Sequence, residues 1–209
     1  MGLNEVSAVE YLDGDLVIHG KISEQLVLRT KNKRQWELYD YDIYNFRSTL
    51  KLETRWDITS GTNYDLTVYS VFKNFYDAAH EVDSGYNNYL KWGSNGSRRG
   101  KDELKYYDTF RDICRELYVE VTNPFWQVRL GKQIVSWGET SFQRMADVVN
   151  PLDGRGTLNP AYPDFDEIKR GLWMAKFTIT PPDFWQDMFF EFLIIPDFEP
   201  NRNWPAGYH

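Results

Sequence analysis

The residues of this chain that are best placed to do chemistry form a row of charges between Tyr44 and Ile58. Five of the seven odd-numbered positions in this segment are charged, with both signs present, and the even-numbered positions are mostly apolar. Successive side chains of a strand point to opposite faces, so the pattern predicts a strand with one ionic and one apolar face. Hydrated charges tune which solutes pass when they line a pore. The same pattern also fits a solvated sheet face, or a ladder of ion pairs that braces the sheet.

Polar positions of other predicted strands extend this ionic face. If the strands pair in one sheet, these side chains share its wet side and stay hydrated inside a lumen. The candidate lumen-lining residues are Lys21, Arg29, Arg47, Lys51, Glu53, Arg55, Glu116, Glu120, Arg129 and Gln133.

The sequence contains none of the common motifs for catalysis or nucleotide binding. It has no G-x-S-x-G nucleophile motif, no P-loop and no G-x-G-x-x-G turn. Carboxylates are numerous, as a paired-acid hydrolase requires, but solubility explains their spread over loops and one strand face. Cys114 is the single cysteine and the three histidines are far apart in sequence, which argues against a disulfide or a local metal motif. We therefore expect no enzymatic activity, no catalytic residue, no cofactor and no metal.

The overall charge argues against nucleic acid as a partner. The 209 residues carry 24 Lys and Arg against 31 Asp and Glu, a net charge of −7, whereas nucleic-acid-binding domains carry a basic patch or stripe. No run of about 18 apolar residues marks a transmembrane helix. Aromatic residues nevertheless make up 17% of the chain. Carbohydrate-binding grooves and the interfacial girdles of membrane barrels are two places for so many aromatic rings.

A period of two along the sequence predicts seven strands. The alternation is clearest over Tyr44–Ile58, and Leu16–Thr30 shows it with two breaks. Both segments exceed the usual strand length of about 5–6 residues and suit a tilted membrane span, which needs about 9–11. The other predicted strands are Tyr64–Phe75, Ile113–Thr122, Trp126–Trp137, Gly171–Thr180 and Trp185–Ile195.

Short and long connections alternate between these strands. The short ones, at 59–63, 123–125 and 181–184, have turn residues, and the long ones, such as 77–112, are polar and Gly-rich. Outer-membrane barrels have short turns at one end and longer loops at the other. The pattern predicts an all-β, antiparallel up-and-down transmembrane β-barrel. Since single-chain bacterial barrels have even strand numbers, seven strands predict that residues 1–209 are one incomplete domain, the N-terminal part of a larger barrel.

Two further features fit this barrel. Phe142, Met145, Ala146 and Val149 have helical spacing before Asn150-Pro151, which predicts a short helix in the third long loop that folds into the barrel mouth. Several tryptophans lie near predicted strand ends, which favours an interfacial girdle over core positions. They are Trp56, Trp126, Trp137, Trp173 and Trp185.

Two sequence blocks resemble a known family. The stretch from Arg129 to Glu139 reads R-L-G-K-Q-I-V-S-W-G-E, and the stretch from Asp147 to Asp153 reads D-V-V-N-P-L-D. Together they resemble the domain-of-unknown-function (DUF) 1302 proteins, which carry an R-x-G-[RK]-Q-x-[VI]-x-W-G-[ED] block followed by a D-x-[IV]-N-P-x-D block. The residues that carry this motif are Gly131, Lys132, Gln133, Trp137, Gly138, Glu139, Asn150, Pro151 and Asp153.

The resemblance implies a location and a fold more than an activity. Members are regarded as Gram-negative outer-membrane barrels, about twice this length or more, associated with hydrophobic or unusual carbon compounds and with envelope partners. Alginate-export and other porin-like barrels share a similar Gly-[Arg/Lys]-Gln strand. This chain departs from the family in its length and in lacking a proline after Asp166-Glu167-Ile168-Lys169. Physically, Gly131 permits a bend or a close approach by an inward loop, and the motif also fits residues that only fix the fold of that loop.

Three hypotheses for function follow. The first is an outer-membrane channel or transport component with a polar lumen, in contact with outer-membrane lipid. The second is a structural barrel with a plugged pore that anchors envelope protein partners. The third is a soluble, aromatic-rich β-sandwich that binds glycans.

Overall fold

The computed structural model describes residues 4–29, 42–59, 63–78, 105–137, 148–154, 168–181 and 188–202. Within these ranges the side chains of residues 4–7, 27–29 and 42–45 are not described. The predicted loop helix around Phe142, and the motif residues Gly138 and Glu139, lie outside the described residues.

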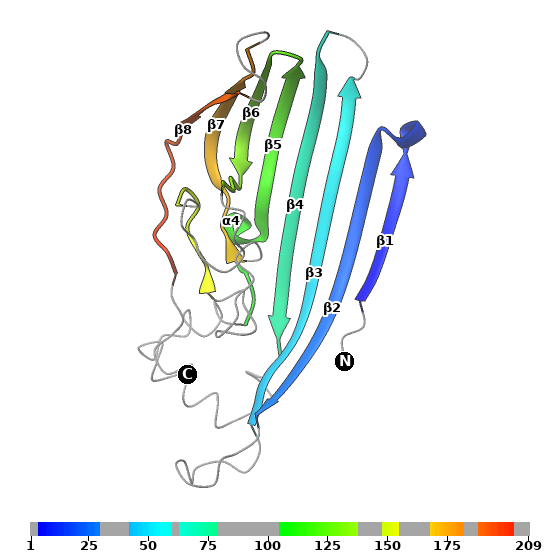
Figure 1. Cartoon of the computed structure of the whole chain (residues 1–209). Helices are drawn as coiled ribbons and strands as arrows, with labels where there is room; N and C mark the ends of the chain where they lie inside the picture. The colour runs from blue at the N-terminus through cyan, green and yellow to red at the C-terminus, as the bar shows by residue number, and fades with distance from the viewer. Residues whose placement is uncertain are drawn as a thin grey trace.

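Within these described ranges, eight strands form one antiparallel sheet in which each strand pairs with the next in sequence (Figure 1). This order confirms the predicted all-β, up-and-down topology. The sheet is open, with β1 and β8 at its two edges. The strands are β1 (Asn4–Tyr11), β2 (Leu16–Arg29), β3 (Asp42–Thr59), β4 (Asp65–Asp77), β5 (Cys114–Asn123), β6 (Trp126–Gln133), β7 (Leu172–Ile179) and β8 (Phe190–Ile194).

Four elements differ from the sequence prediction. Strand β1 was not predicted, because its apolar residues fall on both faces and give no clean alternation. Strand β6 ends at Gln133 rather than Trp137, and β8 begins at Phe190 rather than near Trp185. A short helix, α4 (Phe110–Ile113), precedes β5, and its cap residue Thr109 accepts a hydrogen bond from the backbone N–H of Asp112 at 3.3 Å.

The connections alternate in length as predicted. The 3-10 helix η1 (Leu12–Gly14) joins β1 to β2, and two residues join β5 to β6. The long connections, residues 30–41, 78–113 and 134–171, join β2 to β3, β4 to β5 and β6 to β7. Because the sheet is antiparallel and sequential, these long connections leave it at the same end (Figure 1). We call this end of the strands the loop end, and the opposite end of the strands the turn end.

The two faces of the sheet are inverted relative to a soluble domain. On β3 the apolar side chains at even positions are exposed, for example Leu50 at 54% and Trp56 at 41%, whereas Arg47 on the opposite face is 3% exposed. Buried residues of β4 likewise include Lys73 and Asp77. We call the face with these charged residues the inner face and the apolar face the outer face.

A small apolar core lies at the loop half of the inner face. Val135, Leu172 and Met174 are buried together, and Val149 and Leu193 pack against them. Val135 and Val149 belong to the connection between β6 and β7, so this connection covers part of the inner face. In the described part of the chain, no helix is long and apolar enough to cross a membrane.

Candidate functional site

The strand register places the candidate lumen residues on one face. Directly opposite residues of an antiparallel pair project to the same side. Lys21 lies opposite Lys51, and Glu120 lies opposite both Thr67 and Arg129. The inner face thus carries Lys21, Arg47, Lys51, Glu53, Arg55, Glu116, Glu120, Arg129 and Gln133. Arg29 lies opposite Asp42 in the strand register, and its side chain is outside the described part.

On β3 and β4, charged and hydroxyl groups of the inner face form two neighbouring sets of contacts. Arg55 Nε lies 3.0 Å from one carboxylate oxygen of Asp57, and the other carboxylate oxygen accepts a hydrogen bond from Thr67 Oγ1 at 2.6 Å. Tyr69 donates its hydroxyl hydrogen to Glu53 at 2.7 Å. The short Asp57 side chain holds Arg55, and the rigid Tyr69 ring holds Glu53. These contacts limit the motion of the two charged groups.

The same arrangement continues on β5 to β8. Arg129 Nε donates to Glu120 at 2.7 Å, and its guanidinium lies 4.4 Å from the centre of the Tyr118 ring. Lys176 Nζ lies 2.6 Å from a Glu191 carboxylate oxygen. We call these contacts, with those of Lys51, Glu53, Arg55 and Asp57, the ion ladder. Its side chains are between 12% and 61% exposed, so water reaches them.

Trp137 lies elsewhere than predicted. It lies four residues beyond the end of β6 rather than within the last residues of a strand. Its indole N–H donates to Glu191 on the inner face at 2.6 Å. The prediction that Trp137 belongs to a strand-end girdle is therefore wrong in its placement. Its contact shows that the connection after β6 turns back over the inner face of β8.

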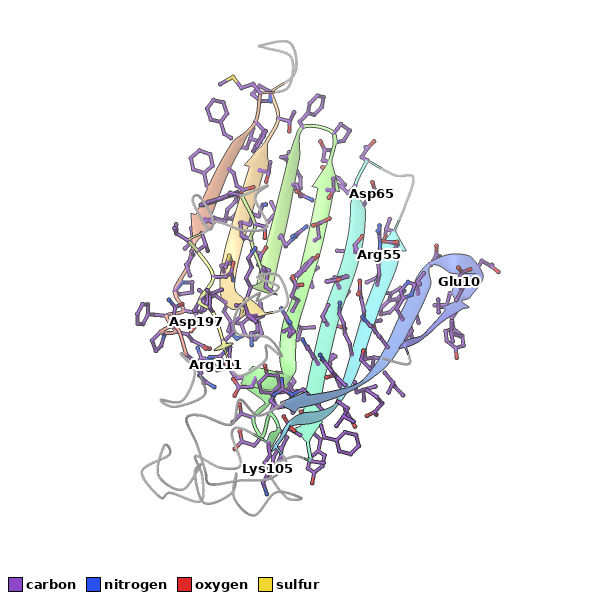
Figure 2. All side chains as sticks on the ribbon, turned by 60° about the horizontal axis from the view of Figure 1, so that its bottom comes forward. Glu10, Arg55, Asp65, Lys105, Arg111 and Asp197 are labelled. Carbon is purple, nitrogen blue, oxygen red and sulfur yellow. The ribbon has the colours of Figure 1, made fainter. Side chains whose placement is uncertain are left out.

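A second group of charges lies at the loop end, around the buried side chains of Asp112, Arg170 and Glu199. Arg170 forms ion pairs with Asp112 and Glu199, and its Nε lies 3.9 Å from Asp153. Arg202 also pairs with Asp112, at 3.0 Å. Arg111 completes the group by pairing with Glu199, and with Asp197 at 2.6 Å. We call these seven residues the loop-end network; Figure 2 shows its members Arg111 and Asp197 close together and apart from Arg55.

Burial determines the electrostatics of this network. Burial lowers the pKa of Arg170, and the nearby carboxylate of Asp112 offsets only part of this effect, so the pKa lies below its ordinary value. Burial also lowers the pKa of Arg111, but Glu199 and Asp197 raise it by more, so that pKa lies above its ordinary value. Arginine stays charged in proteins, so both act as permanent cations.

A small cavity opens beside the network. Its volume is about 20 Å³, and Arg111, Asp112, Asp153 and Arg170 are among its lining residues. A cavity of this size holds about one ordered water molecule, so it suits a bridging water rather than an organic ligand. Among the described residues, no three His, Cys, Asp or Glu side chains converge as metal ligands would.

Residues of the two motif blocks connect the sheet to this network. Lys132 is 2% exposed, and its ammonium donates to the backbone oxygens of Arg111 and Cys114. Gln133 is fully buried, and its amide nitrogen donates to the backbone oxygen of Met174 at 3.1 Å. The motif thus ties the start of β5 to β6 and β7.

Gly131 is required at its position for two reasons. Its φ of 137° lies in the region that favours glycine, and a Cβ there would lie 2.3 Å from the backbone oxygen of Leu117. The close approach is made by strand β5, not by an inward loop as the sequence suggested.

Asn150 and its neighbours fix the return of the long connection. The Asn150 side chain accepts a hydrogen bond from the Val135 backbone N–H at 2.8 Å and donates to the backbone oxygens of Gln133 and Arg170. The Pro151 carbonyl accepts from the Arg170 N–H at 2.9 Å. Asp153 lies in the loop-end network. These motif residues therefore hold the loop end together.

Several charged residues of the inner face and of the loop-end network were not singled out from the sequence. Lys73 and Asp77 follow the polar alternation of β4, which was a usable signal. Asp112, Arg170 and Glu199 lie outside the strands or at their ends, where a period of two carries no information.

Comparison with known proteins identifies a family for this chain. No curated protein and no solved structure matches the chain. A family model described as "Protein of unknown function (DUF1302)" matches residues 29–208. This match covers most of the chain, including both motif blocks and the loop-end network. The chain therefore belongs to the DUF1302 family.

Proposed function

We propose that this protein is a non-enzymatic outer-membrane β-barrel that acts as a channel or transport component. The outer face contacts lipid, the inner face surrounds an aqueous lumen, and exposed aromatic residues near strand ends meet the lipid headgroups. The family resemblance points to hydrophobic or unusual organic compounds as solutes.

The inverted burial of the sheet is the observation that carries this proposal. Large apolar side chains are exposed on almost every strand, among them Ile22, Leu50, Leu130 and Phe192. A contiguous apolar surface of this kind marks contact with lipid or another apolar partner. On the opposite face most of the charged groups are paired and hydrogen-bonded, which is consistent with a polar barrel interior.

Spin labels test the orientation of the two faces. We expect labels at positions 50 and 52, in a Cys114→Ala background, to respond to lipid-dissolved oxygen after reconstitution into liposomes. Matched labels at positions 49 and 51, one residue away on the inner face, should respond to a water-soluble nickel chelate instead. Equal nickel access at all four positions would contradict the proposal.

Conductance tests the channel itself. The full-length protein, inserted into planar lipid bilayers, should give discrete conductance steps. A structural barrel that anchors envelope partners is the second candidate. The contact of Trp137 with Glu191 favours it, because this contact brings a loop over the inner face. Correct face orientation without conductance would support the structural barrel and reject the channel.

The soluble sandwich is less well supported. A sandwich covers its apolar face with a second sheet, whereas the eight described strands form one sheet. The exposed apolar residues of β2, β3 and β8 therefore have no second described sheet against them. A monodisperse protein in buffer without detergent would favour the sandwich.

A further inference from the structure

The register of the sheet brings three lysines together on the inner face. Lys21 of β2 lies directly opposite Lys51 of β3, and Lys51 lies directly opposite Lys73 of β4. Directly opposite residues have Cβ atoms about 4.5–5.5 Å apart, so the three side chains start from one line across the sheet. This line, the lysine row, crosses β3 near the middle of its span, Asp42–Thr59.

The lysine row differs from the rest of the inner face. Toward the loop end Arg47 lies opposite Asp77, and toward the turn end Glu120 lies opposite Arg129, so cations face carboxylates. Arg129 also lies opposite Lys176, but each of these two forms an ion pair with a carboxylate. Like charges directly opposite one another destabilise a sheet. Three lysines in line therefore act against stability.

The exposed half of the lysine row, Lys21 and Lys51, carries an excess of positive charge among the described residues. Lys51 has one carboxylate neighbour, Glu53, at 3.6 Å, and Lys21 forms no ion pair within the described part of the chain. The row also runs from the exposed Lys21 to the buried Lys73. Lys73 has contacts of its own, so a solute anion that approaches from water meets Lys21 and Lys51 rather than Lys73.

We propose that the lysine row is an anion-binding step on the solute path and that the solutes of this protein carry an oxyanion group such as a carboxylate. This inference rests on the proposed function, because it requires the inner face to line the lumen. Lysine suits the role because its ammonium is a mobile point charge that binds an oxyanion without fixed geometry. Binding of this kind stays weak enough for release, which conduction requires.

Reversal potentials across a KCl gradient test the proposal. The full-length protein in planar bilayers should prefer chloride to potassium. The K21E/K51E variant should lower the chloride-to-potassium permeability ratio by about threefold or more, because two cations near the path become anions. The matched control is K176Q/E191Q, which removes an ion pair of the same face without changing its net charge and should leave the ratio unchanged.

Calorimetric titration with citrate separates the inference from the proposed function. Wild-type protein in detergent should bind citrate, and K21E/K51E should lose that binding while K176Q/E191Q keeps it. Conductance without anion preference or citrate binding would overturn the lysine row but leave the channel intact. Citrate binding that depends on the lysines, without any conductance, would overturn the channel but retain the lysine row. The variant pair avoids Lys73, whose burial couples it to folding.

Discussion

The ion ladder and the loop-end network use the same chemistry in two environments. Both consist of Arg or Lys paired with Asp or Glu, and both lie on chain segments that the motif blocks join. In the ladder, Arg55 is 61% exposed and its pair with Asp57 is open to water. In the network, Arg170 is 7% exposed and pairs with carboxylates from two distant segments.

The difference separates charges that hold the fold from charges that can act on a solute. An ion pair exposed to water contributes little to stability, so its residues are free to serve passage through a lumen. Removal of one partner from a buried pair leaves an uncompensated charge and destabilises strongly. The network therefore fixes the long connections, and the lysine row remains the candidate for selectivity.

The largest expected effect comes from Arg170→Met. This change leaves Asp112 and Glu199 buried with fewer cations, so we expect the free energy of unfolding to fall by about 3–5 kcal/mol. Urea unfolding of protein refolded in liposomes, followed by tryptophan fluorescence, measures it. The matched control is Arg55→Met, which should cost less than about 1 kcal/mol. Equal losses in the two variants would show that the two regions do not differ.

Gly131→Ala tests the boundary between the two regions, since Arg129 belongs to the ladder and Lys132 contacts the start of β5. The new Cβ would clash with the Leu117 oxygen at a positive φ, so we expect a loss of about 2–3 kcal/mol in the same unfolding assay.

Gly14→Ala is the control for Gly131→Ala. Gly14 also has a positive φ, 99°, but no atom lies within 4 Å of its added Cβ. It should cost only about 1 kcal/mol, from backbone conformation alone. If Gly131→Ala costs no more than Gly14→Ala, the close approach of β5 and β6 does not matter for stability.

The sequence predicted the sheet well wherever one face is ionic and the other apolar. On β3 the alternation from Phe46 to Ile58 identifies both the strand and its faces. Strand β1 escaped prediction because Val6 and Ala8 lie on one face by register, and Val9 and Tyr11 on the other. The alternation of short and long connections predicted the up-and-down order without any knowledge of strand pairing.

The candidate site was predictable in part for the same reason. Lys51 and Arg129 could be placed on the inner face from parity alone, but the alignment of Lys21, Lys51 and Lys73 needed the register between strands. The loop-end network could not be predicted, because its partners are distant in sequence: Arg202 and Asp112 are 90 residues apart. The resemblance marked Asn150 and Asp153, but not the backbone groups and charges that they contact.

The smallest expected effect, from Glu120→Gln, tests whether the ladder is hydrated. The change removes one charge of the Glu120–Arg129 pair but keeps its shape, and Arg129 retains its contact with the Tyr118 ring. We expect a loss below about 1 kcal/mol that disappears in 1 M KCl, where the screening length falls to about 3 Å. The loss caused by Arg170→Met should persist in the same salt, because buried pairs are screened much less.

A large, salt-resistant loss for Glu120→Gln would mean that the ladder is as dry as the network. In that case the inner face is plugged, and the structural barrel would replace the channel as the better account of function.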